Sequence, residues 1–139
     1  MKEMNSYLTF DGNAREAMEF YKTCLGGELA VMTFADSPMK AQTPPGAEKR
    51  VMHARLKSGP TILMASDTMP GMPFHQGNNF SLAISCETQQ ESDKLFAALG
   101  AGGKVIMPLQ ETFWAARFGM LTDKFGVNWM LDLDKPQQG

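Results

Sequence analysis

The sequence predicts an α+β fold in which two similar βαβββ modules pair into a cup-shaped mixed sheet. The first observation behind this prediction is an internal repeat, because a shift of 74 positions places Leu8 on Leu82 and Gly26 on Gly100. The second is that each half has an apolar strand pattern followed by a helical pattern that ends at a Leu-Gly pair. The third is the segment 108–126, where an aromatic pair and a Thr-Asp-x-x-Gly turn close the second half.

The chain is long enough for one domain with a substantial core. It has 139 residues, of which 43% are hydrophobic and 20% are charged, as is typical of globular proteins. Each half alone would bury little apolar surface, so we expect a single domain over residues 1–139. The halves cover residues 1–67 and 79–134, and the Pro- and Gly-containing segment 68–78 is the predicted linker between them.

The first half begins with a strand that leads into an amphipathic helix. Asp11 or Asn13, in the turn after this strand, can cap the helix, and Gly26 ends the helical spacing of apolar residues. Prolines and a glycine within residues 35–48 indicate an irregular loop. The expected elements are a strand over residues 7–10, a helix over 14–25, and strands over 28–34, 50–57 and 61–66.

The second half repeats this order. Its helix is expected to stop at the glycines after Leu99, and a Thr-Asp-x-x-Gly turn joins its last two strands. The expected elements are a strand over residues 80–86, a helix over 90–99, a strand over 104–109, a loop around 113–114, a strand over 117–122, a hairpin turn over 123–126, and a strand over 127–133.

Charge and composition argue against several classes of protein. A formal net charge of −2 and the lack of a Lys/Arg cluster make a nucleic-acid partner unfavourable. No apolar run approaches the ~20 residues of a membrane helix, and the first ten residues lack the core of a signal peptide, so we expect no membrane association and a cytoplasmic location. Cys24 and Cys86 have no metal-binding or disulfide-framework spacing, which favours reduced thiols.

Several stretches resemble the vicinal oxygen chelate superfamily of glyoxalase and bleomycin-resistance proteins, and most closely its PhnB-like branch. They are residues 7–21, 52–56, 63–67, and 108–114 through 129–131, so nearly the whole chain is covered. The resemblance implies a ligand site inside the cup and a homodimer. Members of this branch sometimes carry a methyltransferase label. Glycines 100, 102 and 103, however, follow a predicted helix and precede a strand, which is the reverse of a nucleotide-binding loop.

The resemblance also implies positions for a metal ion, because metal-dependent members of the superfamily place four ligands on the cup floor. These positions fall on Ser6, Met64, Phe80 and Met130. None of the four is a His, Asp or Glu, and thioethers suit only soft metals such as Cu(I). We therefore expect no metal and no cofactor.

His53 and Arg55 are the polar candidates of the first half. Strand alternation places them with Val51 on one face, while Met52, Ala54 and Leu56 lie on the other, which is continuous with the apolar core. His53 can act as an acid, base or hydrogen-bond donor, although a satisfied structural histidine is an alternative. Arg55 can bind a carboxylate or phosphate, or else form an ion pair with Asp67 or Asp132.

The second half contributes aromatic and amide candidates. Trp114 can stack on a flat ligand, Gln110 can orient it, and Phe118 can extend the aromatic wall, whereas core packing or a subunit interface is the alternative, favoured for Phe113. Met64 and Met130 are expected to face the cup from their strands, where methionine adapts to varied ligands.

Three functions remain open on this sequence. The first is a metal-free binder of a small hydrophobic or planar molecule. The second is an enzyme of the lyase, isomerase or oxygenase type. In it, His53 acts as acid or base, and Arg55 or Gln110 polarises a carbonyl or phosphonyl oxygen of the substrate. The third is a divergent metal enzyme that combines His53 with Asp67 or Glu111. The expected partners are thus a small-molecule ligand and a second copy of the chain.

Overall fold

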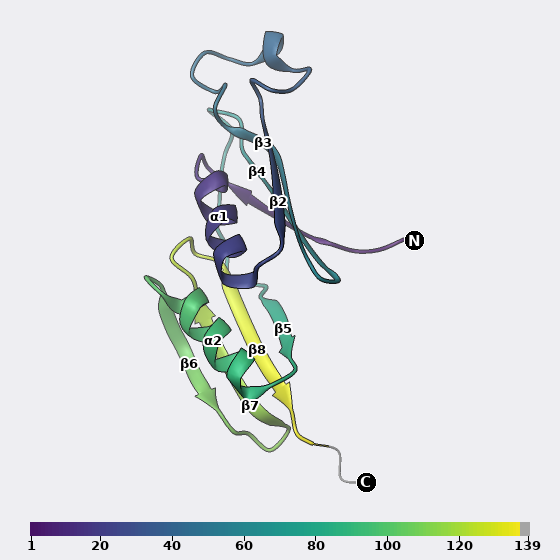
Figure 1. Ribbon diagram of the computed structural model, residues 1–139. Coiled ribbons are helices and arrows are strands. Elements are labelled where there is room, and N and C mark those ends of the chain that lie inside the picture. Colours follow the sequence, from purple (N-terminus) through teal and green to yellow (C-terminus); the bar gives the residue numbers. More distant parts are fainter. Residues whose placement is uncertain (137–139) are drawn as a thin grey trace. The chain divides into compact units, whose positions relative to one another are not determined.

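Two compact units make up the chain, and each contains one α-helix and one sheet (Figure 1). The computed structural model describes residues 1–136. The first unit is Met1–His75 and the second begins at Gln76. No helix within the described residues is both long and apolar enough to cross a bilayer.

The first unit is a βαβββ module with a four-stranded mixed sheet in the order β1-β4-β3-β2. Strands β1 and β4 are parallel, whereas β2–β3 and β3–β4 are antiparallel. A short 3-10 helix, η1, lies in the loop that was expected to be irregular. The elements are β1 Ser6–Phe10, α1 Ala14–Leu25, β2 Glu28–Thr33, η1 Lys40–Gln42, β3 Val51–Ser58 and β4 Thr61–Asp67.

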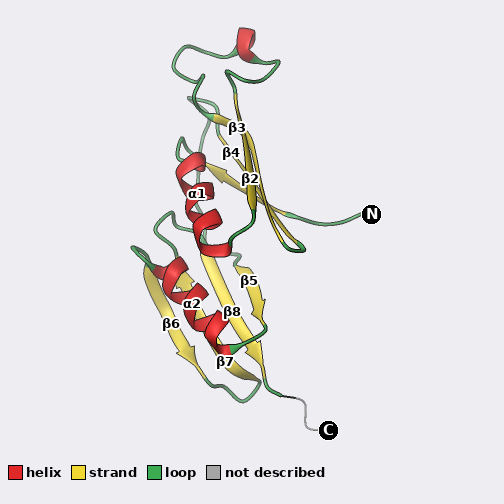
Figure 2. Ribbon diagram, in the orientation of Figure 1, coloured by secondary structure: helices red, strands yellow, loops and turns green. Residues whose placement is uncertain are grey.

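The second unit repeats the arrangement, with a sheet in the order β5-β8-β7-β6 (Figure 2). Here β5 and β8 are parallel, and the other neighbouring pairs are antiparallel. Its elements are β5 Leu82–Cys86, α2 Gln89–Gly100, β6 Lys104–Gln110, β7 Ala115–Thr122 and β8 Asn128–Asp134. The predicted α+β fold of two βαβββ modules is confirmed at the level of these elements.

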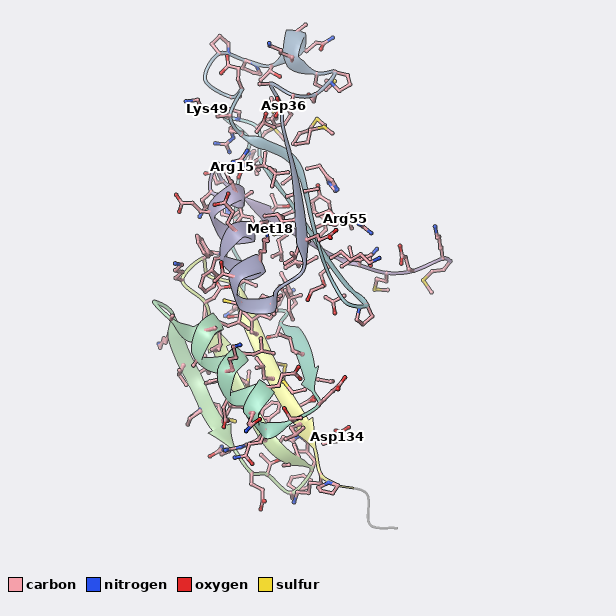
Figure 3. All side chains as sticks on the ribbon, viewed as in Figure 1. Arg15, Met18, Asp36, Lys49, Arg55 and Asp134 are labelled. Carbon is pink, nitrogen blue, oxygen red and sulfur yellow. The ribbon has the colours of Figure 1, made fainter. Side chains whose placement is uncertain are left out.

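Each helix covers one face of its own sheet. In the first unit, Met18 and Tyr21 of α1 are fully buried, as is Leu56 of β3, and Figure 3 shows Met18 in the layer between helix and strands. In the second unit, Leu99 of α2 and Leu131 of β8 have no exposed surface. Burying a side chain of this size contributes about 1.5–3 kcal/mol. Among residues 1–136, no helix of the same unit lies against the opposite face of either sheet.

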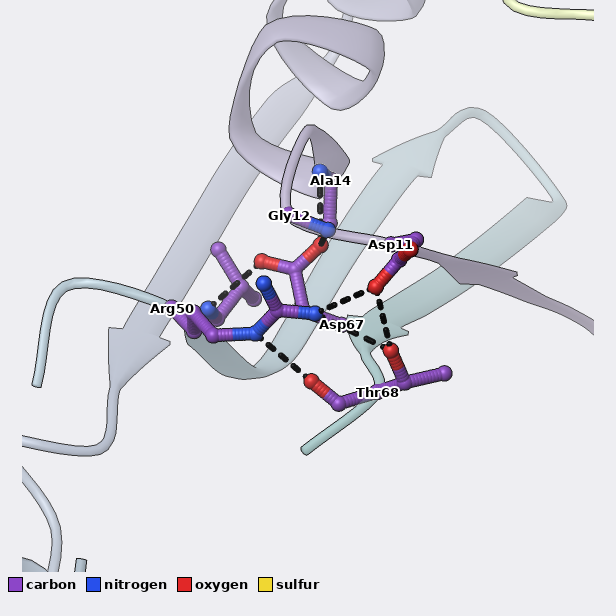
Figure 4. A network of polar contacts seen from close by, with 7 residues as sticks. Asp11, Gly12, Ala14, Arg50, Asp67 and Thr68 are labelled. Carbon is purple, nitrogen blue, oxygen red and sulfur yellow. Dashed lines mark hydrogen bonds and ion pairs between the residues drawn. The ribbon is translucent and has the colours of Figure 1, made fainter. Parts of the chain in front are cut away.

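The N-terminus of α1 is capped from a distant strand. Asn13 occupies the N-cap position but makes no side-chain hydrogen bond there. Instead, Asp67 at the end of β4 accepts hydrogen bonds from the backbone N–H groups of Gly12 (2.9 Å) and Ala14 (3.0 Å), as drawn in Figure 4. The expectation of a local cap was therefore wrong, because a carboxylate brought close by the β1–β4 pairing replaces it.

A backbone irregularity at the start of β3 changes one predicted orientation. Thr33 pairs with Val51 and Met32 with His53, so the register shifts and Met52 has no partner in β2. The extra residue returns Val51 to the helix-covered face, where it is 1% exposed. The prediction that Val51 shares a face with His53 was wrong, whereas Ala54 and Leu56 are buried as expected.

Glycine is required where each helix turns into the next strand. A Cβ on Gly27 would overlap the Lys57 carbonyl oxygen, and a Cβ on Gly103 would overlap that of Thr122. Both glycines lie just after a helix and against a hairpin of their own sheet. The corresponding position and contact in the two units support the internal repeat seen in the sequence.

Candidate functional site

The helix-free face of the first sheet is a mixed polar and apolar surface, here called the first open face. Alternation along β1, β3 and β4 sends Leu8, Leu56 and Leu63 toward α1, where they are buried. The residues between them, and their neighbours on β2, point the other way. The first open face consists of Tyr7, Thr9, Glu28, Ala30, Met32, His53, Arg55, Lys57, Ile62, Met64 and Ser66.

Three predicted site residues share this face. Arg55 pairs directly with Met64 across β3 and β4, and His53 lies two positions from Arg55 on the same strand. Figure 3 shows Arg55 on the side of the sheet away from α1. The alternation predicted from the sequence therefore places His53, Arg55 and Met64 together.

Tyr7 is a member of this group that the sequence reasoning missed. Its hydroxyl lies 3.4 Å from His53 Nδ1, and the two rings are tilted by 37° with centroids 5.9 Å apart. On β1, Tyr7 pairs in parallel with Met64. The buried Leu8 and Phe10 were a signal that could have found it, since Tyr7 must alternate away from them.

Asp67 is excluded as an ion-pair partner of Arg55. It is 7% exposed on the helix-covered face. One carboxylate oxygen accepts from the N–H groups of Gly12 and Ala14, and the other accepts from Val51 N–H at 2.8 Å. Within the described part of the first unit, Arg55 forms no ion pair. The same burial argues against Asp67 as a metal ligand beside His53.

An ion pair between Arg50 and Asp11 lies at the β1–α1 turn, close to the start of β3 and the end of β4 (Figure 4). Arg50 donates to Asp11 Oδ1 at 2.9 Å and to the backbone oxygen of Thr68 at 2.7 Å, while the Thr68 hydroxyl also donates to Asp11. The hydrogen bonds from Arg50 and Thr68 hold the pKa of Asp11 below its usual range. This cluster ties the β1–α1 turn to the ends of β3 and β4.

The helix-free face of the second sheet, here called the second open face, carries methionine side chains and the aromatic ring of Phe118. Cross-strand register defines two rows on it. Gln110, Phe118 and Asp132 form one row, and Met107, Met120 and Met130 form the other. The second open face consists of Ala83, Ser85, Lys104, Met107, Gln110, Phe118, Met120, Thr122, Asn128, Met130 and Asp132.

Trp114 packs beside this face. Its ring meets that of Phe118 edge-on, with centroids 5.4 Å apart, and Phe113 meets Trp114 at 4.8 Å. Trp114 is 52% exposed and Phe113 is 89% exposed. The structure therefore brings the predicted residues Gln110, Trp114, Phe118 and Met130 onto one surface, and core packing is excluded for Phe113 within the isolated chain.

The four positions expected for metal ligands do not all face one way. Met64 and Met130 lie on open faces, but Ser6 alternates with Tyr7 and belongs to the helix-covered side of β1. Phe80 precedes β5. The described residues contain no group of three His, Cys, Asp or Glu side chains placed to hold a metal ion. Ser6 thus lies one residue from Tyr7, which is on the open face.

Cys86, at the end of β5, is a poor nucleophile. It is a free thiol and 8% exposed. Burial raises its pKa to about 11, with further contributions from the carboxylates of Glu91 and Asp132. Because the thiolate is the reactive form, this cysteine stays protonated and unreactive near neutral pH.

Comparison with known proteins agrees with the duplicated fold. The family model described as 3-demethylubiquinone-9 3-methyltransferase matches residues 2–131. Protein YjdN of Escherichia coli K12 is 37% identical, with 96% of this chain and 97% of that protein aligned. The crystal structure of protein PA1353 from Pseudomonas aeruginosa is 43% identical and has a TM-score of 0.89, covering 98% of this chain and 100% of that one.

Two further structures connect the chain to a wider fold. A Bacillus cereus structure described as a putative 3-demethylubiquinone-9 3-methyltransferase, PhnB protein, is 31% identical, with a TM-score of 0.76 over 95% of this chain and 99% of that one. A glyoxylase/bleomycin resistance protein/dioxygenase domain from Frankia is 17% identical, with a TM-score of 0.67 over 97% and 98% of the two chains, and it shows the fold alone. The chain therefore belongs to the PhnB-like family described as 3-demethylubiquinone-9 3-methyltransferase, within the glyoxalase/bleomycin-resistance fold.

Proposed function

We propose that this protein binds a small organic molecule on its helix-free sheet faces without a metal ion or other cofactor. The observation that carries the proposal is the exposed aromatic cluster of Trp114 and Phe118 beside the methionines of the second open face. Exposed apolar surface of this kind marks binding sites. Membership of a fold whose solved relatives include bleomycin-resistance proteins supports the same reading.

The chemistry of the second open face suits a flat ligand. Trp114 offers an aromatic surface that Phe118 holds edge-on, and Gln110 stands opposite Phe118 with both an amide donor and an acceptor. Met120 and Met130, directly paired across β7 and β8, supply polarisable contacts that adapt to irregular shapes. Together they favour a planar molecule with one or two polar groups.

Methyl transfer, which the family description names, has little support from the glycines of this chain. Gly100 ends α2 and Lys104 begins β6, so the glycines link a helix to a strand and not a strand to a helix. Glycine is required at position 103 because a Cβ there would overlap the Thr122 carbonyl oxygen. A packing requirement thus accounts for the segment, and we propose binding in place of methyl transfer.

The test compares the wild-type protein with Trp114→Ala. Small molecules that co-purify with each are identified by native mass spectrometry, and the compound found is titrated while intrinsic fluorescence is followed. Loss of an aromatic platform is expected to weaken binding by ~1–3 kcal/mol. Cys24→Ala, on α1, is the control and should bind normally. Equal affinity and unchanged fluorescence response of Trp114→Ala would contradict the proposal.

An enzyme that uses His53 is the second candidate. The Tyr7–His53 contact favours it, because a hydrogen bond to one ring nitrogen orients the other. Conversion of the co-purified compound by the wild-type protein, lost in His53→Asn, would establish this alternative.

We also propose a homodimer and a cytoplasmic location. Exposed apolar side chains on β6 support the dimer, since Val105 and Ile106 are 48% and 53% exposed. The location is proposed because Cys24 and Cys86 have no disulfide-framework spacing, which is typical of proteins in reducing compartments.

A further inference from the structure

We propose that the first open face binds an oxyanion of the ligand, a carboxylate or a phosphoryl group, through Arg55 and His53, with Tyr7 as the residue that positions His53. The inference rests on the proposed small-molecule binding and adds to it the chemical class of the ligand. It also assigns a role to Tyr7.

Arg55 is an exposed cation on an inner strand, and it forms no ion pair with any described residue of the first unit. Its register neighbours are Ala30 on β2 and Met64 on β4, neither of which can pair with a charge. Asp67 lies on the other face and is held by backbone N–H groups. A guanidinium group in this position is preorganised for bidentate hydrogen bonds to an oxyanion.

The charges of the first open face leave an excess of positive charge. Lys57 has Glu28 directly opposite it on β2, so this lysine has a carboxylate within reach at the end of the face. Glu28 is the only carboxylate among the first-open-face residues, which carry two permanent cations, Arg55 and Lys57. One net positive charge therefore remains on this face, and Arg55 lies two residues from His53 on β3.

Tyr7 gives His53 a defined donor. A phenol hydroxyl can donate to a neutral imidazole nitrogen, and the contact between Tyr7 Oη and His53 Nδ1 is 3.4 Å. We infer that Tyr7 donates here, which places the imidazole proton on Nε2. His53 and Arg55 are two residues apart on one strand, or ~7 Å. Their N–H groups can converge on a single carboxylate or phosphoryl group between them.

The surroundings of this pair suit the organic part of such a ligand. Met64 lies between Tyr7 and Arg55 in the register, and Met32 pairs with His53 on its other side. Met32 is 40% exposed and Tyr7 is 47% exposed. The anion site is thus bordered by apolar surface, as a site for an organic acid requires.

The experiment titrates the full-length protein with phenylphosphonate, benzoate and neutral benzamide, and follows the Arg55 Nε–H and His53 ring signals by NMR. Phenylphosphonate or benzoate should produce saturable shifts at both residues, and the stronger of the two identifies the oxyanion. Arg55→Gln should weaken this binding by at least about 10-fold. Lys57→Gln, on the same strand and face, is the matched control and should change affinity less than twofold.

Tyr7→Phe tests the positioning role separately. The wild-type imidazole should show the Nε2–H tautomer in long-range proton–nitrogen spectra. Tyr7→Phe should give a mixture of tautomers and weaker anion binding, while its backbone spectrum stays folded. An Nδ1–H tautomer in the wild type would overturn the role of Tyr7.

Equal binding of benzamide, no binding of either anion, or an Arg55→Gln variant with full affinity would overturn the oxyanion site. If the Trp114→Ala experiment succeeds in those cases, small-molecule binding stands and only the ligand class falls. Failure of both experiments would remove the proposed function as well.

Discussion

A single carboxylate at Asp67 organises three segments of the first unit. Its two oxygens accept from Gly12 and Ala14 at the start of α1 and from Val51 at the start of β3. Each of these N–H groups would otherwise be left without a partner at a buried helix or strand end. The second unit also has a buried carboxylate with several donors, but it acts within one hairpin, since Asp123 accepts from Phe125, Val127 and the Trp129 indole.

Replacing Asp67 should therefore be costly. We expect Asp67→Ala to lower the free energy of unfolding by about 2–4 kcal/mol, because buried N–H donors lose a charged acceptor. Urea denaturation monitored by circular dichroism measures this. Asp67→Asn, which keeps one acceptor oxygen, should lose less, and an Asp67→Ala variant as stable as the wild type would contradict the capping role.

Asp11 is the control for this experiment. It is exposed, and Arg50 and Thr68 lower its pKa. A lowered pKa in the folded state stabilises the protein above the usual carboxyl pKa and loses that effect as the pH falls through the folded-state value. Asp11→Asn should thus be mildly destabilising near neutral pH and differ less from the wild type below about pH 4, with a smaller effect than Asp67→Ala throughout.

At the scale of elements, local patterns in the sequence predicted most of the fold. Helix α1 begins and ends at the predicted residues, Ala14 and Leu25, because the helical spacing is bounded by a turn and by Gly26. Strand bounds agree to within two residues. The errors came from non-local causes. The cap of α1 depends on the β1–β4 pairing, and the irregularity that moves Val51 depends on the register with β2.

The glycines after α2 allow a test of close packing between elements. A Cβ at Gly103 would overlap the backbone of Thr122, whereas a Cβ at Gly100 would lie 3.6 Å from Leu121, an ordinary contact. Gly103→Ala should cost about 1–3 kcal/mol, while Gly100→Ala, at the end of a helix, should be neutral or stabilising by up to ~1 kcal/mol. Thermal unfolding of both variants decides this, and equal melting temperatures would refute the packing argument.

At the scale of the whole molecule, the candidate site was only partly predictable. Alternation placed His53, Arg55, Met64 and Met130 on helix-free faces correctly, since a strand with one buried side leaves no choice for the other. Tyr7 was missed, and its position on the open face follows from the burial of its neighbours Leu8 and Phe10. The edge-on packing of Trp114 on Phe118 depends on loop conformation, which no sequence pattern specifies.

The proposed homodimer is tested by light scattering coupled to size exclusion. We expect a mass of twice the 15.3 kDa chain at micromolar concentration, because obligate interfaces bury on the order of 2,000 Å² or more and resist dilution. The exposed Val105 and Ile106 of β6 are suited to such burial. A mass of one chain across a dilution series would contradict the dimer.

Every strand pairing of the described residues lies inside one unit, because β1 closes on β4 and β5 closes on β8. Each sheet is therefore formed entirely by strands of its own unit. No strand pairing among the described residues joins the two sheets. Domain swapping, in which two copies of the chain exchange one unit, would therefore break no strand pairing in either sheet. Among the described residues, the half and not the whole chain is thus the unit within which strand pairing is satisfied.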